Sequence, residues 1–66
     1  MNNKVKEIRQ KIGMSRAELS RRSGVSLRTI DDWENKRKIA RDVYLIEKVA
    51  RALNCTIYDL IDFEEE

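Results

Sequence analysis

The sequence predicts a compact all-α domain of five short helices, and three features lead to this prediction. The 66 residues include no proline, so no position forbids a helix, and breaks depend on caps and glycines. Strand-like alternation is nowhere sustained. An apolar stripe recurs at helical offsets in the second half of the chain, formed by Leu45, Ile46, Val49, Ala50 and Leu53. We therefore expect one domain over residues 1–66, with its core at about 4–62 and an acidic tail at 63–66.

The first helix is expected over residues 3–12, with a buried face formed by Val5, Ile8 and Ile12. Gly13 follows, and glycine is the usual residue for the left-handed conformation that ends a helix. The sequence therefore places the first break of the chain at Gly13.

Ser15 begins a second helix, and Glu18 follows it at the spacing of a capping box. In that arrangement each side chain satisfies a backbone N–H of the other residue. The helix is expected to end near Ser23, with Gly24 as the turn. Ser26 then caps a third helix that runs to about Asn35.

The fourth helix carries the apolar stripe and lies between two capping residues. Asp42 is a good N-cap for it, and Asn54 can close it. Thr56 and Asp59 repeat the capping-box spacing and predict a short fifth helix. Its inward-facing residues are expected to be Ile57, Leu60 and Ile61.

The composition excludes several classes of function. One cysteine and no histidine rule out an intramolecular disulfide, the usual zinc sites and His-based catalytic triads. With two glycines in the chain, no Gly-rich phosphate loop can be drawn. No apolar run approaches the ~18 residues of a membrane span. We expect a protein that is not an enzyme, needs no cofactor or metal, and is cytoplasmic and associated with the nucleoid.

The charges are distributed unevenly along the chain. Residues 1–41 hold 12 Lys and Arg against 5 Asp and Glu, whereas residues 42–66 hold 2 against 7. A basic part and an acidic part suit a protein with one face that meets a polyanion such as nucleic acid. An ordinary mixed surface remains the alternative explanation.

Residues 15–35 have the spacing of two helices joined by a tight turn. Four apolar residues are placed to hold the helices together: Leu19, Val25, Ile30 and Trp33. Ser20 is small where the helices cross, and Gly24 stands where the turn requires a positive φ. A steep crossing would project the later helix outward into the major groove of DNA.

The same stretch resembles the phage-repressor and Cro-type helix-turn-helix family, also called the xenobiotic-response-element type. The resemblance extends from about Val5 to Ile61, and its motif residues are Leu19-Ser20, Gly24-Val25-Ser26, Thr29-Ile30 and Trp33-Glu34-Asn35. It implies a lambda-repressor-like fold and a prokaryotic or phage transcription regulator, usually a repressor. Members commonly bind palindromic operators as homodimers. We expect any dimer contact at the end of the fourth helix, the fifth helix or the C-terminus.

The third helix is the candidate recognition helix, with a polar row formed by Arg28, Asp31, Asp32 and Asn35. The resemblance assigns base contacts to the positions of Leu27, Arg28 and Asp32. Arg28 suits a guanine, Leu27 a thymine methyl group and Asp32 a cytosine amino group. Alternatively, Arg28 and Asp32 simply pair on the helix surface. The full set of predicted base contacts is Ser26, Leu27, Arg28, Asp31 and Asp32.

Phosphate contacts are expected on both sides of that helix. The family has Gln at the position of Arg16, where it binds a phosphate, and usually Gly at the position of Lys36. The latter difference predicts an altered helix end, with Asn35 left-handed. The predicted phosphate contacts are Arg16, Thr29, Asn35, Lys36, Arg37, Lys38 and Arg41. A solvated basic loop is the alternative for the residues after Asn35, and we expect Arg21 and Arg22 to face solvent.

Several other residues have a structural explanation beside a functional one. The resemblance implies a buried ion pair between Arg9 and Glu34, whereas Arg9 as a phosphate ligand is the alternative. Trp33 is expected in the core rather than stacked on bases, with Tyr44 and Tyr58 partly exposed. Cys55 is expected to be a buried small hydrophobe rather than a redox switch.

Two functions from different classes fit these observations. The first is sequence-specific binding of a double-stranded DNA operator as a transcriptional regulator. The second is a protein-interaction module on the same fold, such as an antitoxin or accessory factor with weak DNA binding. Asp31 and Asp32 favour the second, because carboxylates repel phosphates.

Overall fold

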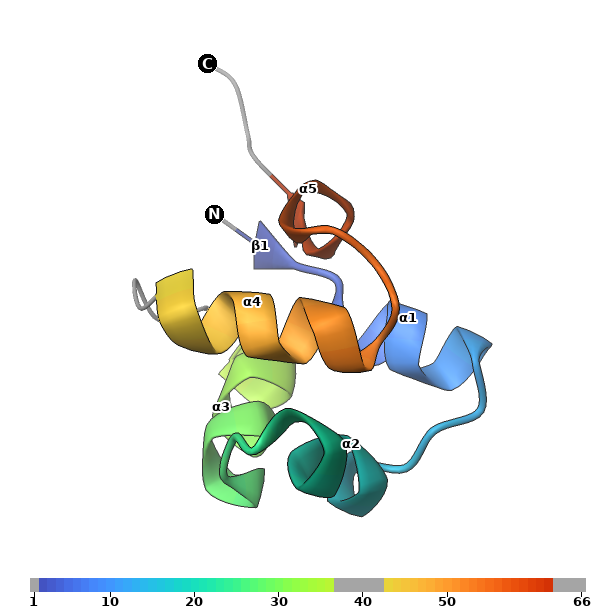
Figure 1. The fold of residues 1–66 in the computed structure, drawn as a ribbon, viewed down its shortest axis with the longest axis vertical. Coiled ribbons are helices and arrows are strands. Elements are labelled where there is room, and N and C mark those ends of the chain that lie inside the picture. The colour runs from blue at the N-terminus through green and yellow to red at the C-terminus, as the bar shows by residue number, and fades with distance from the viewer. Residues whose placement is uncertain (1, 37–42, 63–66) are drawn as a thin grey trace.

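The computed structural model describes residues 2–36 and 43–62, which form five helices and two short strands (Figure 1). The all-α prediction is confirmed, with a two-stranded antiparallel pair added to it. The elements are β1 (Asn2–Asn3), α1 (Val5–Lys11), α2 (Arg16–Ser23), α3 (Leu27–Lys36), α4 (Val43–Ala52), α5 (Ile57–Leu60) and β2 (Ile61–Asp62).

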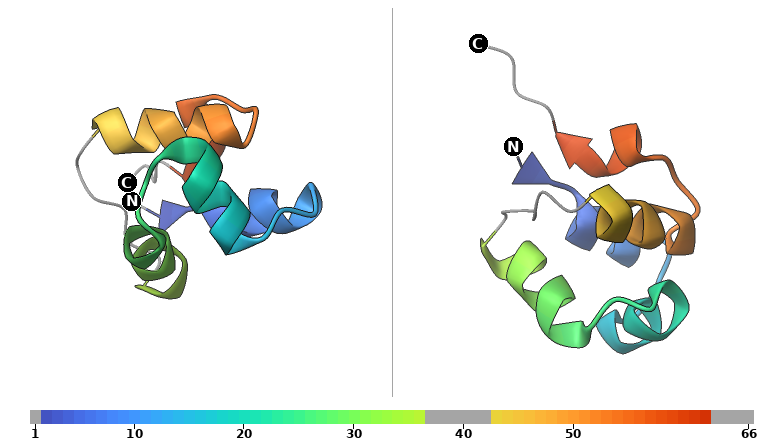
Figure 2. Two further views of the ribbon diagram at one scale, coloured as in Figure 1. Left: turned by 60° about the horizontal axis from the view of Figure 1, so that its bottom comes forward. Right: turned by 60° about the vertical axis from the view of Figure 1, so that its left-hand side comes forward.

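Helix α4 crosses the middle of the molecule and packs against both α2 and α5. Helices α2 and α3 lie together on one side of it, and α1 packs against α3. The turned views show α2 and α3 meeting at a steep angle at the edge of the molecule opposite α5 (Figure 2). The pair is therefore presented at one end of the fold.

One apolar core joins all five helices. Each helix contributes to its most deeply buried side chains. These are Val5, Leu19, Ile30, Val49, Leu53 and Leu60. The stripe predicted for α4 is confirmed, since Ile46, Val49, Ala50 and Leu53 are buried and Leu45 packs at their edge. Trp33 is 3% exposed, as expected of a core residue.

Two helices end in the same way, at the residues that the sequence suggested. After α1 the N–H groups of Gly13 and Met14 bond to the carbonyls of Gln10 and Arg9, and Gly13 has a φ of 74°. After α4 Asn54 is left-handed, and the Cys55 N–H bonds back to a carbonyl five residues earlier. Both are Schellman ends, which satisfy the last carbonyls of a helix.

The capping box predicted for the start of α2 is only half formed. The Ser15 hydroxyl accepts a hydrogen bond from the Glu18 N–H at 3.1 Å. The Glu18 carboxylate does not complete the capping box, because it binds Arg22 one turn later at 2.8 Å. The box at the start of α5 is complete, with Thr56 and Asp59 each bonding to the backbone of the other.

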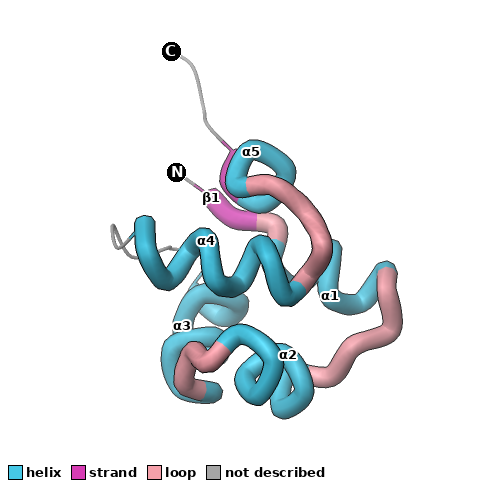
Figure 3. The backbone as a smooth tube through the Cα atoms, viewed as in Figure 1, coloured by secondary structure: helices cyan, strands magenta, loops and turns pink. Residues whose placement is uncertain are grey.

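The first helix begins later than predicted, because Asn3 belongs to β1. The Asn3 backbone pairs with that of Ile61, and the Lys4 N–H donates to the Leu60 carbonyl at 2.8 Å. The Asn3 side chain accepts from the Val5 N–H and donates to the Trp33 carbonyl, both at 3.1 Å. The N-terminal residues are thus tied to α3 and to the strand after α5 (Figure 3).

Two apolar residues differ from their predicted places. Ile12 is 49% exposed, because the chain leaves α1 there and Met14 turns into the core instead. Ile61 is buried as predicted but lies in β2, since its backbone pairs with Asn3. The predicted cap Asp42 lies outside the described residues.

Replacing Asn3 by Ala is expected to lower the free energy of unfolding by about 2 kcal/mol, because two hydrogen bonds of about 1 kcal/mol each are lost. Urea denaturation measures the change. Gln10→Ala, on the exposed side of α1, is the control and should change the stability little. An equal effect of both substitutions would contradict the role given to Asn3.

Candidate nucleic-acid interface

The turn between α2 and α3 is closed by short polar side chains. The Ser20 hydroxyl donates to the Val25 carbonyl at 2.7 Å, and the Ser23 hydroxyl accepts from the Val25 N–H at 3.1 Å. Gly24 has a φ of 76°, and a Cβ there would meet nothing within 4 Å. Glycine is needed at this position for its backbone conformation and not for space.

A buried ion pair joins α1 to α3. The Arg9 Nε and Nη2 atoms donate to the two carboxylate oxygens of Glu34 at 2.8 and 3.1 Å. The remaining terminal nitrogen, Nη1, donates to the Met14 carbonyl at 2.7 Å. The Glu34 side chain is 2% exposed, so Arg9 is fully engaged inside the protein and its guanidinium is not presented to a phosphate.

Arg16 binds the same face of α3 from the outside. It is the first residue of α2, and its Nη1 makes an ion pair with Asp31 Oδ1. Its Nε lies 3.9 Å from Glu34 Oε1. The sequence suggested no partner for Asp31, because no helical spacing relates residues on different helices.

The outer face of α3 carries the residues predicted to contact bases. Leu27 is 47% exposed, and Arg28 and Asp32 are exposed beside it on the first two turns. Within residues 2–36 and 43–62 the structure contains no ion pair between Arg28 and Asp32. The surface pairing considered as an alternative is absent there, so both side chains are available to a partner.

The start of α3 is capped as predicted. The Ser26 hydroxyl accepts from the Thr29 N–H at 3.1 Å and donates to the Thr29 hydroxyl at 2.9 Å. Both hydroxyls are therefore engaged in capping.

Asn35 is exposed, but the prediction that it is left-handed is wrong, because α3 continues through Lys36.

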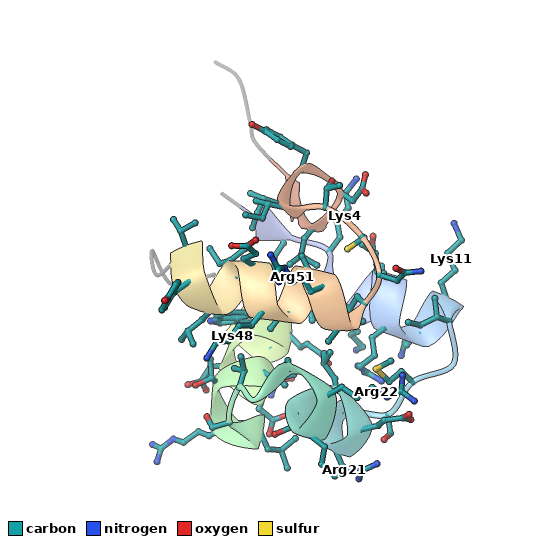
Figure 4. The ribbon with its side chains drawn as sticks, in the orientation of Figure 1. Lys4, Lys11, Arg21, Arg22, Lys48 and Arg51 are labelled. Atoms are coloured by element: carbon teal, nitrogen blue, oxygen red, sulfur yellow. The ribbon has the colours of Figure 1, made fainter. Side chains whose placement is uncertain are left out.

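The cations predicted to bind phosphates are described in part. The Lys36 side chain and residues Arg37, Lys38 and Arg41 lie outside the described residues. Arg21 and Arg22 stand on α2 at the lower edge of the view, whereas Lys4 and Lys11 lie at the two ends of α1 (Figure 4). Arg22 pairs with Glu18 while its side chain stays 61% exposed, as expected of a solvent-facing residue.

Comparison with known proteins gives a result consistent with this geometry. A family model described as "Helix-turn-helix" matches residues 5–60. The chain belongs to the helix-turn-helix family. Two proteins of Archaeoglobus fulgidus, each named an uncharacterised helix-turn-helix-type transcriptional regulator, are 39% and 38% identical to it. Both matches cover this whole chain, and they cover 92% and 93% of the relatives.

This helix-turn-helix protein leaves its tyrosines more exposed than expected, at 76% for Tyr44 and 81% for Tyr58. Lys48 lies 5.9 Å from the centre of the Tyr44 ring. Cys55 is half-buried, and burial together with the nearby Asp59 carboxylate raises the pKa of its thiol. A raised pKa keeps the thiol protonated, which disfavours the redox alternative.

No cluster of Cys, Asp and Glu that would hold a metal ion is found in 2–36 and 43–62. None of the helices in these ranges has the length and apolar character to cross a bilayer.

Replacing Glu34 by Ala is expected to lower the free energy of unfolding by about 3 kcal/mol, because Arg9 is left charged and buried without its partner. Thermal melting measures the loss, and Asp32→Ala on the exposed side of α3 is the control. Replacing Arg9 and Glu34 together by Leu should cost less than Glu34→Ala, since no charge is stranded. A melting temperature of Glu34→Ala close to that of the wild type would refute this account.

Proposed function

We propose that this helix-turn-helix protein binds double-stranded DNA sequence-specifically and regulates transcription as a repressor. The observation that supports this most directly is the two-sided character of α3. Ile30 and Trp33 fix its inner side in the core, while Leu27, Arg28 and Asp32 stand exposed on its outer side. A rigidly held helix with an exposed polar row fits the major groove, which is wide enough to admit it.

Arg28 is the proposed main reader of sequence. Its guanidinium fork matches the O6 and N7 atoms of guanine, which gives the commonest specific contact in protein–DNA complexes. Leu27 can pack on a thymine methyl group, and Asp32 can accept from a cytosine amino group. Ser26 and Asp31 are less suited to base contacts, because their oxygens already bind Thr29 and Arg16.

The proposed attachment to the DNA backbone uses cations on both sides of α3. Arg16 stands at the N-terminal end of α2, where backbone N–H groups also favour an anion. Asn35 and the basic residues that follow it would bind phosphates on the other side of the groove. The basic residues of that group are Lys36, Arg37, Lys38 and Arg41.

We propose a homodimer on DNA, binding a palindromic operator with half-sites about 34 Å apart. The proposal is supported by family membership and by the small size of the reading surface, since one short helix contacts few base pairs. A nucleoid-associated, cytoplasmic location follows from this function. Selection of bound sites from a random DNA pool tests the proposal, because a palindromic consensus would report both specificity and symmetry.

A protein-interaction module with weak DNA binding is the second candidate. The Arg16–Asp31 ion pair supports it, because it neutralises a cation at a position where the family binds phosphate. The carboxylate of Asp32, which is exposed on the outer face of α3, adds repulsion. A gel shift with random and genomic DNA separates the two candidates, since absence of binding at low salt favours the interaction module.

Replacing Arg28 by Ala is expected to lower the ratio of operator affinity to random-DNA affinity by about 10- to 100-fold, because one bidentate base contact is lost. Fluorescence anisotropy with the selected operator and a random duplex measures this ratio. Arg21→Ala removes the same charge from the exposed side of α2 and should leave the ratio unchanged. An unchanged ratio for Arg28→Ala would show that Arg28 does not read the DNA sequence.

Replacing Arg37 by Ala is expected to weaken binding to all sequences alike, because a phosphate contact carries no base information. The slope of log K against log salt should become shallower by about 1, the effect of one lost phosphate contact. The same anisotropy titrations at several salt concentrations measure it. A change in the operator-to-random ratio would instead assign Arg37 a role in specificity.

A further inference from the structure

The ion pair between Arg16 and Asp31 lies on the surface where α2 and α3 meet. The side chains of Arg16 and Asp31 are 45% and 44% exposed, whereas Glu34 beneath them is 2% exposed. Arg16 therefore contacts α3 through Nη1 and Nε while its side chain remains partly open to solvent. A ligand that approaches this surface meets Arg16 and Asp31 together.

The charges of this cluster show which carboxylate neutralises Arg16. Glu34 makes two hydrogen bonds with Arg9 at 2.8 and 3.1 Å, and its nearest approach to Arg16 is 3.9 Å. Asp31 is in direct contact with Arg16 and makes no other ion pair within residues 2–36 and 43–62. The positive charge of Arg16 is thus neutralised mainly by Asp31.

We propose that Asp31 acts as an intramolecular substitute for a DNA phosphate and lowers the affinity of the protein for DNA of any sequence. Carboxylates and phosphates are the two anionic groups that the guanidinium fork recognises in the same way. In the DNA complex a phosphate would take the place of Asp31 on Arg16. This inference rests on the proposed function and assigns Asp31 a role in setting DNA affinity without a base contact.

The exposure of the pair makes such an exchange feasible. Ion pairs open to solvent contribute little to stability, because water solvates the separated charges well. A phosphate held by neighbouring contacts can therefore displace Asp31 at small cost. The Arg9–Glu34 pair underneath is buried and stays closed, so Arg16 can change partner without loss of the fold.

The consequence is largest for binding that depends on charge. A protein that neutralises one more phosphate steepens the plot of log K against log salt by about 0.9. Removal of the Asp31 charge frees Arg16 and should add this contribution. Binding to the operator gains by the same factor, because a phosphate contact carries no base information, so the operator-to-random ratio is unchanged.

Asp32 provides a matched control. It adjoins Asp31 on the same helix, carries the same charge and is exposed. It makes no ion pair in the described parts of the chain, 2–36 and 43–62. Asp32→Asn therefore measures how much DNA affinity rises when a carboxylate near DNA is removed. Any larger rise in affinity for Asp31→Asn measures the release of Arg16.

The experiment compares the wild type, Asp31→Asn, Asp32→Asn and Arg16→Ala with the two double variants that combine Arg16→Ala with Asp31→Asn or with Asp32→Asn. Anisotropy titrations with a random-sequence duplex at several salt concentrations give affinity and salt slope. Asp31→Asn should bind about two- to fivefold tighter than Asp32→Asn, the range that the measured coupling of exposed ion pairs allows. In the Arg16→Ala background this excess should disappear.

Three results of these titrations would overturn the inference. Weaker binding by Asp31→Asn than by the wild type would mean that Asp31 positions Arg16 for phosphate. Equal affinities and salt slopes for Asp31→Asn and Asp32→Asn would mean that each substitution acts only by removing a negative charge near DNA. An excess that persists in the Arg16→Ala background would show that Arg16 does not mediate it. Circular dichroism melts verify that each variant is folded.

A second measurement needs no DNA and keeps the inference separate from the proposed function. Inorganic phosphate is titrated into each protein while the NMR signal of the Arg16 Nε–H group is followed. The signal should shift at lower phosphate concentration in Asp31→Asn than in the wild type or Asp32→Asn. Equal shifts in all three refute the inference, whereas absence of DNA binding combined with the expected shifts refutes the proposed function alone.

Discussion

The placement of α3 depends on the buried ion pair between Arg9 and Glu34. Withdrawing two charges from water is costly unless good geometry and further hydrogen bonds compensate. Arg9 meets this condition with two bonds to Glu34 and a third to the Met14 carbonyl. A single guanidinium therefore holds α1, the turn that follows it and the last turn of α3 in one arrangement. The same bonds leave Arg9 no role in contacting a ligand.

A second guanidinium extends this arrangement to the surface. Arg16 lies between Asp31 and the outer oxygen of Glu34, so positive and negative groups alternate from the core outward. The charges of Arg16 and Asp31 consequently cancel where α2 meets α3. Arg28, near the start of α3, keeps its charge unpaired within residues 2–36 and 43–62. The positions suited to phosphate attachment and to base reading are thus separated along the helix-turn-helix.

Features that depend on near neighbours in the chain could be predicted from the sequence. The φ requirements at Gly13 and Gly24, the caps at Ser26 and Thr56 and the stripe on α4 involve residues within a few positions of one another. Their energetics are local, so spacing and residue type suffice. The outer row of α3 was predictable for the same reason, because helical periodicity decides which side of the helix faces the core.

By itself, then, the sequence determined the helical class, most helix ends and the two faces of α3, since each follows from interactions within one or two turns. The tertiary structure decided the contacts between residues far apart. Asn3 reaches the Trp33 carbonyl, 30 positions away, and Arg16 reaches Asp31, 15 positions away. No periodicity relates such residues, because only the packing of α1, α2 and α3 brings them together. For that reason Asp31, which the sequence placed among the base contacts, is found bound to Arg16.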